Sequence, residues 1–211
     1  RRLVLQQFNA ITPENVLKAE TVHPSPDVWN FAPGDAYVKM GEANHLFVVG
    51  HTLIWHNQTP DWFFKDAEGH PKSHDAMVEQ MRSYIATVVG RYKNSINAWD
   101  VVNEVIDPAQ ADCMRRSPWY NLTGTDFIDT AFRTARALLP AHVKLYYNDY
   151  STTDAPKLAC LHKLVQGLKS RGVPIDGIGH QMHISLNYPT PGMVANMVRG
   201  LASAFPGISQ Q

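Results

Sequence analysis

Cysteine is scarce in this sequence, since Cys113 and Cys160 are the only two among 211 residues. Two cysteines do not make the dense disulfide framework of a small secreted domain. They also do not form the paired groups of ligands that structural zinc sites need. The spacing leaves open whether Cys113 and Cys160 pair with each other or stay free.

An excess of either charge is also lacking, because 19 Lys and Arg residues are balanced by 19 Asp and Glu residues. A balanced charge gives no basic surface for nucleic acid or for an anionic membrane. No apolar run is long enough to span a bilayer, and the first residues, RRLVLQQ, lack the apolar core and cleavage site of a signal peptide. We therefore expect no nucleic acid partner and no membrane partner.

A glycine-rich phosphate loop is missing as well. The first predicted strand is followed by Thr12-Pro13-Glu14-Asn15, whereas a doubly wound dinucleotide-binding sheet carries glycines at that turn. This absence disfavours a nucleotide-binding sheet, and we expect no cofactor.

Short apolar runs alternate with amphipathic helical patterns along the whole chain. Strands are predicted at residues 7–12, 46–56, 96–104, 143–148 and 175–184, and helices at 35–44, 74–92, 124–139, 153–171 and 191–205. Thr153 is the expected N-cap of the helix at 153–171, and Gly172 its stop. Such alternation predicts an α/β fold with a parallel sheet and right-handed crossovers, in a single domain over 1–211.

The run at residues 96–104, INAWDVVNE, is the most informative segment. It reads as a buried parallel strand that ends in Asn103 and Glu104, and barrel enzymes keep their chemistry at the carboxyl ends of strands. The other strand ends also carry polar and aromatic residues, namely Glu14, Asn15, Lys18, His51, Trp55, Gln58, Asn148, Tyr150, Gln181 and His183. Hydroxyl-binding groups beside aromatic faces suit a sugar ligand.

Other interpretations of these residues remain open at this point. Glu104 could simply end a strand, Glu14 and Lys18 could form a surface helix pair at i,i+4, and Trp55 could belong to the core. The histidines could be buried structural residues or the zinc ligands of a metal-dependent barrel hydrolase. Their spacings match no common zinc signature such as His-Glu-x-x-His, so we expect no metal.

Five ordered motifs make the chain resemble the xylanases of glycoside hydrolase family 10. They are FNAITPEN at 8–15, VGHTLIWH at 49–56, WDVVNE at 99–104, YNDY at 147–150 and GIGHQMH at 177–183. The resemblance runs from about Phe8 to the end of the chain. It implies a (β/α)8 TIM barrel, here incomplete, with about strands two to six present.

The resemblance also assigns roles to individual residues. Glu104 matches the general acid/base, and Asn103 matches the residue that binds the sugar 2-hydroxyl at the cleavage point. The remaining matches are the sugar contacts Glu14, Asn15 and Lys18, the glycone walls His51, Trp55 and Gln58, the residues near the reacting centre Asn148 and Tyr150, and the last group Gln181 and His183. In relatives, the histidine at the position of His183 contacts the nucleophile.

Three departures from the family pattern matter. Ala19 follows Lys18 where the family usually has tryptophan. The family's first strand is not encoded before Arg1, and the chain stops at Ser209-Gln210-Gln211, where the seventh strand with its nucleophilic glutamate should begin. We therefore expect the strands at 7–12 and 175–184 each to lack one neighbour.

The implied activity is that of an endo-1,4-β-xylanase that retains anomeric configuration, with Glu104 as acid/base and the nucleophile beyond this chain. Its partners would be xylan and xylo-oligosaccharides, and the parent protein would be secreted or periplasmic. Two alternatives stay open: a fragment that binds xylo-oligosaccharides without cleaving them, and the metal-dependent barrel hydrolase.

Overall fold

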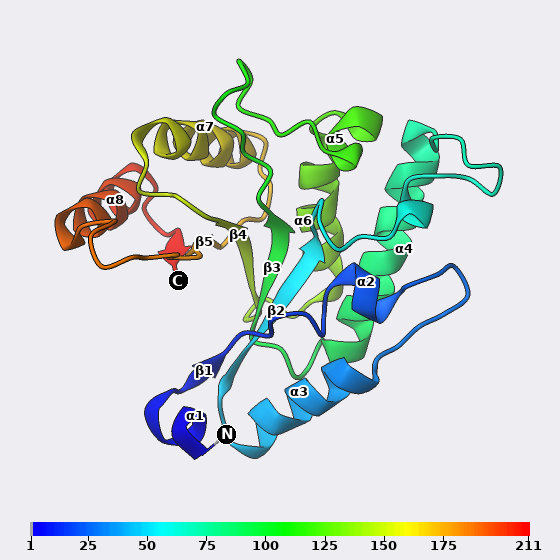
Figure 1. The fold of residues 1–211 in the computed structure, drawn as a ribbon, viewed down its shortest axis with the longest axis horizontal. Coiled ribbons are helices and arrows are strands. Elements are labelled where there is room, and N and C mark those ends of the chain that lie inside the picture. The colour runs from blue at the N-terminus through cyan, green and yellow to red at the C-terminus, as the bar shows by residue number, and fades with distance from the viewer. Residues whose placement is uncertain (1) are drawn as a thin grey trace.

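The computed structural model describes residues 2–211, which form one curved sheet of six parallel strands with helices along its outer side (Figure 1). The strands are β1 Ala10–Ile11, β2 Phe47–Ile54, β3 Ala98–Asn103, β4 Lys144–Asp149, β5 Gly177–His180 and β6 Ser209–Gln210. They neighbour one another in sequence order, from β1 to β6. This sequential parallel order is that of a (β/α)8 barrel.

Helices occupy the connections between the strands, as expected for right-handed crossovers. They are α1 Arg2–Gln7, α2 Ala19–Val22, α3 Ala32–Ala43, α4 His74–Tyr92, α5 Pro118–Thr123, α6 Asp126–Leu138, α7 Ala155–Ser170 and α8 Pro191–Ala204, with a 3-10 turn at Asp61–Phe63. Among the helices of residues 2–211, none combines the length and hydropathy that a bilayer crossing needs.

Helix α4 illustrates why the sequence folds in this way. Ser73 caps its first turn by accepting a hydrogen bond from the Ala76 amide. Met77, Met81 and Ile85 then recur at helical spacing, and all three are buried in the core cluster. The opposite side of the sheet is left free of helices, and the candidate site lies there.

The structure corrects several of the predicted boundaries. Gln7 belongs to α1 rather than to the first strand, which is reduced to Ala10–Ile11. The strand predicted at 175–184 covers only Gly177–His180, so Gln181 and His183 lie in the following loop. Helix α7 begins at Ala155 with Asp154, not Thr153, in the N-cap position.

The expectation that the strand at 175–184 lacks a neighbour is wrong, because β5 pairs with β6 through Gly177 and Ile178. Strand β1, by contrast, pairs only with β2 among residues 2–211. The sheet therefore has six strands where five were predicted.

The open question about the cysteines is settled by the structure, in which Cys113 and Cys160 form a disulfide. Cys113 lies between β3 and α5, and Cys160 lies on α7. The bond therefore attaches the loop that follows Glu104 to the neighbouring helix.

Candidate active site

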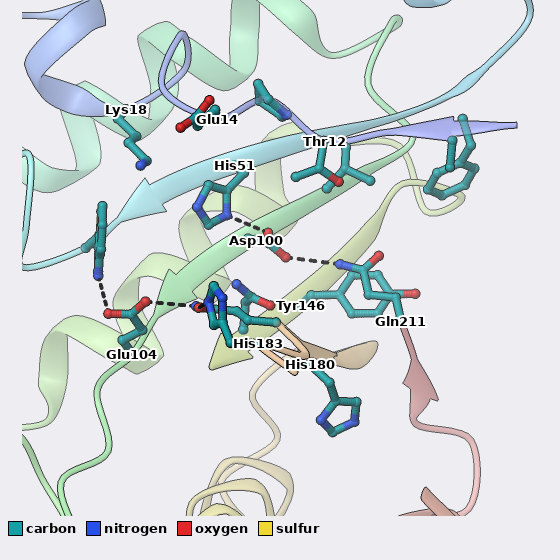
Figure 2. A pocket seen from close by; sticks show the side chains of 17 residues that line it. Thr12, Glu14, Lys18, His51, Asp100, Glu104, Tyr146, His180, His183 and Gln211 are labelled. Carbon is teal, nitrogen blue, oxygen red and sulfur yellow. Dashed lines mark hydrogen bonds and ion pairs between the residues drawn. The ribbon is translucent and has the colours of Figure 1, made fainter. Parts of the chain in front are cut away.

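A cavity of about 800 Å³ opens along the helix-free face of the sheet (Figure 2). Eight of the predicted site residues line it: Glu14, Lys18, His51, Trp55, Glu104, Asn148, Gln181 and His183. The other four, Asn15, Gln58, Asn103 and Tyr150, do not line the cavity. The structure therefore brings together side chains from the ends of β1 to β5.

Glu104 directly follows β3 and is only 8% exposed, although its carboxylate faces the cavity. The Trp55 indole Nε1 donates to one carboxylate oxygen at 2.8 Å, and the Gln181 amide Nε2 donates to the other at 2.8 Å (Figure 2). Both oxygens are thus held by N–H donors, one at the end of β2 and one in the loop after β5. An oriented carboxyl group at a cavity wall can donate or accept a proton at one fixed place.

Three carboxamides, of which Gln181 contacts the Glu104 carboxylate, form a connected group beside this glutamate. The Asn103 side chain is 1% exposed, and its amide contacts the Asn148 amide at 2.9 Å and the Gln181 amide at 3.3 Å. The His183 Nε2 lies 2.8 Å from the Gln181 Oε1. Although the loop after β5, rather than a strand, positions Gln181 and His183, both face the cavity.

Lys18 occupies the wall beside Trp55. Its Nζ donates to the Asn15 Oδ1 at 3.0 Å and to the Gln58 Oε1 at 2.7 Å, and it lies 4.6 Å from the centre of a Trp55 ring. Burial lowers the pKa of this ammonium, while the charges of Glu14 and Glu104 oppose that shift. Residues 14–18 are not helical, so the interpretation of Glu14 and Lys18 as a surface helix pair is wrong.

The structure adds a polar pair that the sequence analysis missed. The His51 Nδ1 lies 2.8 Å from the Asp100 Oδ2, and the Gln211 amide donates to the other Asp100 oxygen at 3.1 Å (Figure 2). Asp100 lies within β3, four residues before Glu104, which directly follows the strand. Both residues line the cavity, but the partners of Asp100 are distant in the sequence, so no local pattern identified it.

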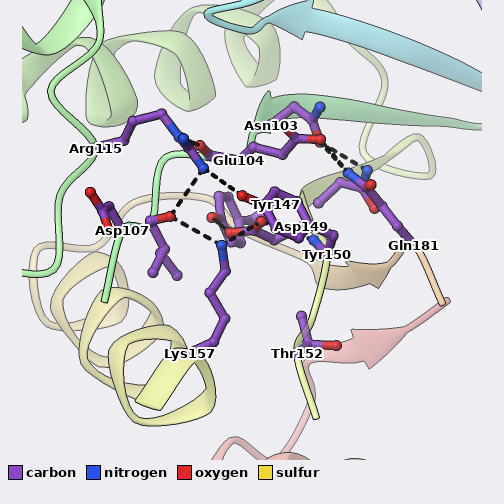
Figure 3. A network of polar contacts seen from close by, with 12 residues as sticks. Asn103, Glu104, Asp107, Arg115, Tyr147, Asp149, Tyr150, Thr152, Lys157 and Gln181 are labelled. Carbon is purple, nitrogen blue, oxygen red and sulfur yellow. Dashed lines mark hydrogen bonds and ion pairs between the residues drawn. The ribbon is translucent and has the colours of Figure 1, made fainter. Parts of the chain in front are cut away.

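Tyr150 does not line the cavity and lies beside Arg115 and Glu104 (Figure 3). Its hydroxyl accepts a hydrogen bond from the Arg115 Nη2 at 2.9 Å, and the same guanidinium contacts the Glu104 backbone. Tyr150 is thus connected to the glutamate through Arg115 rather than through the cavity.

Residues 2–211 contain no set of side chains suited to bind a metal ion. No three His, Cys, Asp or Glu side chains there lie close enough together to hold an ion. His51 and His183 instead make hydrogen bonds to Asp100 and Gln181. No observation therefore favours the metal-dependent hydrolase.

Comparison with known proteins gives a consistent result. The sequence profile of glycosyl hydrolase family 10 matches residues 1–206. An endo-1,4-beta-xylanase A from Caldicellulosiruptor sp. (strain Rt8B.4) is 42% identical over 212 residues, which cover 98% of this chain and 31% of that protein. The chain thus spans less than a third of the length of this curated relative.

Solved structures agree on the fold. Xylanase B from Clostridium stercorarium F9 superposes with a TM-score of 0.94 at 39% identity, covering 99% of this chain and 64% of that one. A mutant solved in complex with xylotriose gives 0.92 at 33% identity, covering 100% of this chain and 63% of its own. These matches confirm the predicted fold class, an incomplete (β/α)8 barrel.

Proposed function

Because the chain belongs to glycosyl hydrolase family 10, we propose that the protein it comes from is an endo-1,4-β-xylanase. The observation that carries this proposal is the placement of Glu104, whose two carboxylate oxygens are held by Trp55 and Gln181 at the wall of the cavity. The names of the similar proteins and the xylotriose complex support xylan and xylo-oligosaccharides as its ligands.

The proposed reaction is a double displacement with retention of configuration. Glu104 protonates the glycosidic oxygen as the bond to the anomeric carbon breaks, and it later removes a proton from the attacking water. Asn103, which packs against Asn148 directly before Glu104, would bind the 2-hydroxyl at the cleavage point; its match to the family motif supports this role.

The other side of the cleavage point would hold the glycone. Lys18 and Gln58 would bind sugar hydroxyls there, with Trp55 offering an aromatic face. Glu14 and His51, which line the cavity, and Asn15, which holds Lys18, would complete this group, and His183 and Gln181 would complete the wall opposite.

No residue of 1–211 matches the nucleophile of this mechanism. Glu14 and Asp100 are the other acids that line the cavity in residues 2–211, and both oxygens of Asp100 are already hydrogen-bonded to His51 and Gln211. The attacking glutamate would come from the parent protein beyond residue 211. For residues 1–211 alone, this observation favours the second candidate function, binding of xylo-oligosaccharides without cleavage.

Two further statements belong to the proposal. We treat residues 1–211 as part of a single catalytic barrel domain, which the continuous sheet and core cluster support. Export of the parent protein to the periplasm or the medium is supported by the Cys113–Cys160 disulfide, since disulfides persist in oxidising compartments.

The test replaces Glu104 with Ala in the parent enzyme, with the exposed Glu79→Ala as a matched control. Aryl xylobiosides with poor leaving groups should lose roughly 100-fold or more in kcat/KM, because their departure needs a proton. Activated leaving groups should lose far less at bond cleavage, and azide should restore turnover. Equal losses on both substrates without azide rescue would contradict the role of Glu104.

A further inference from the structure

The backbone of Glu104 adopts an unusual conformation, with a φ of 59° in the left-handed region. A residue with a Cβ rarely occupies this region, and it persists there only when its surroundings hold it. On one side, the Glu104 amide donates to the Asn148 carbonyl oxygen at 3.0 Å. The amide of Glu104 is thus held, and the direction of the side chain therefore also depends on what holds the Glu104 carbonyl group.

Arg115 supplies the second contact. Its Nε donates to the Glu104 carbonyl oxygen at 2.8 Å, and its Nη2 donates to the Tyr150 hydroxyl at 2.9 Å (Figure 3). The planar guanidinium thus bridges the end of β3 and the end of β4. Arg115 does not line the cavity, so it reaches the reacting atoms only through Glu104.

The segment that carries Arg115 is itself firmly attached. The Arg115 amide donates to the Val105 carbonyl oxygen at 2.8 Å, and Ile106 pairs with Met114 in an antiparallel bridge. The Lys157 Nζ, buried on α7, donates to the Ile106 carbonyl oxygen at 3.0 Å.

One covalent bond and one ion pair anchor this segment further. Cys113 is bonded to Cys160 of α7, and Lys157 forms an ion pair with the fully buried Asp149 at 2.8 Å. The position of Arg115 is therefore fixed relative to the sheet before any substrate binds.

We propose that Arg115 is a positioning residue for the acid/base: it locks the left-handed peptide of Glu104 and so aims the carboxyl group at the glycosidic oxygen. This inference rests on the proposed function, in which Glu104 donates a proton. It extends the site beyond the cavity wall, to a guanidinium that the substrate does not touch.

The test uses the parent enzyme with Arg115→Met, which keeps much of the aliphatic stem and removes the donors. The matched control is Arg116→Met, because the neighbouring Arg116 pairs with the exposed Asp112 at 2.9 Å and does not contact Glu104. Turnover is measured on aryl xylobiosides with a poor and with an activated leaving group.

We expect Arg115→Met to lower kcat/KM, which reports cleavage of the glycosidic bond, roughly tenfold more on the poor leaving group than on the activated one, with KM on the poor leaving group within about twofold, as for loss of proton donation in the transition state. Arg115→Lys should restore part of this loss, since it keeps the charge without the fork. Arg116→Met should leave the ratio between the two substrates unchanged.

Equal losses on both substrates, or no loss, would overturn the positioning role. If Arg115→Met does not fold, the same comparison is made with Arg115→Lys. If the wild-type parent is inactive on these substrates, the proposed function is contradicted but the positioning role of Arg115 is not. A crystal structure of Arg115→Met then tests that positioning role. In that structure, the φ of Glu104 should differ from 59° and its hydrogen bond with Trp55 should be lost. An unchanged conformation of Glu104 would overturn the positioning role.

Discussion

Gly50 shows how tightly a single position is constrained in this sheet. It pairs with Trp99 across β2 and β3, and a Cβ added at Gly50 would lie 2.2 Å from the Trp99 ring. Trp99 is fully buried, so it has little room to move aside. The glycine is therefore required by close packing.

We expect Gly50→Ala to lower the free energy of unfolding by roughly 1–3 kcal/mol, because overpacking forces side chains off their rotamers. Urea titration followed by tryptophan fluorescence measures the change. Gly90→Ala is the matched control, since nothing lies within 4 Å of a Cβ at that exposed position of α4. That variant should gain roughly 0.5–1 kcal/mol from helix propensity, and a loss at Gly90 similar to that at Gly50 would contradict the packing argument.

The sequence allowed the site to be predicted where motifs are local. Glu104 with Asn103, and His51 with Trp55, lie in short runs whose strand ends could be recognised directly. Asp100 was missed because its partner His51 is 49 residues away, and Gln211 is 111 residues from Asp100. Arg115 was missed for a similar reason, since its role follows from the backbone conformation of Glu104, which no residue pattern encodes.

At the scale of elements, the type of each helix and strand was predicted more reliably than its ends. Helix 74–92 has the bounds that its periodicity predicts. The strand predicted at 175–184 ends early, because β4 pairs with it only from Gly177 to His180. Strand ends are set by the neighbouring strand, and hydrophobic alternation in one segment does not contain that information.

The disulfide joins two elements and gives a prediction at this scale. Cys113 and Cys160 are 47 residues apart, and loop-closure entropy for such a separation corresponds to about 4 kcal/mol. We expect the double variant Cys113→Ser/Cys160→Ser to lose most of this stability, with a lower Tm by calorimetry.

Reduction provides the control for that variant. A thiol reductant should lower the Tm of the unmodified chain and leave that of the double variant unchanged. An equal response of both proteins to the reductant would show that the disulfide is not the stabilising element.

For the whole molecule, histidines whose pKa is lowered by burial or partial burial make stability depend on pH. Burial lowers the pKa of His56 to about 4, with Arg115 and Lys157 adding to the shift, and burial also lowers the pKa values of His23 and His180. Between pH 4 and about 6.5, the unfolded chain therefore binds protons that the folded chain does not. The free energy of unfolding should rise with pH across this window.

Urea titrations at pH 4.5, 5.5 and 6.5 test the slope. Asp149, whose pKa is raised by burial, and the exposed His74, whose pKa is raised by Asp75, act in the opposite direction. His56→Gln isolates the contribution of one residue and should flatten the curve. A variant with the same slope as the unmodified chain would show that the pKa of His56 does not differ between the folded and the unfolded chain.

The two ends of the sheet decide how residues 1–211 behave when produced alone. Near β1, Phe8 is 60% and Phe47 is 42% exposed, and after β5, Ile184 is 68% and Leu186 is 103% exposed. Within residues 2–211, β1 and β6 each pair with one neighbour only, so each also presents unpaired backbone groups at its edge.

Apolar side chains beside open strand edges favour association between copies. We expect residues 1–211 to self-associate, with a mass above 23.7 kDa that rises with concentration in light scattering. Phe8→Lys combined with Leu186→Lys places a charge at each end and should shift the distribution toward monomer. A monodisperse monomer that unfolds cooperatively before any substitution would contradict this expectation, because it would show that the two ends remain stable in water without a covering partner.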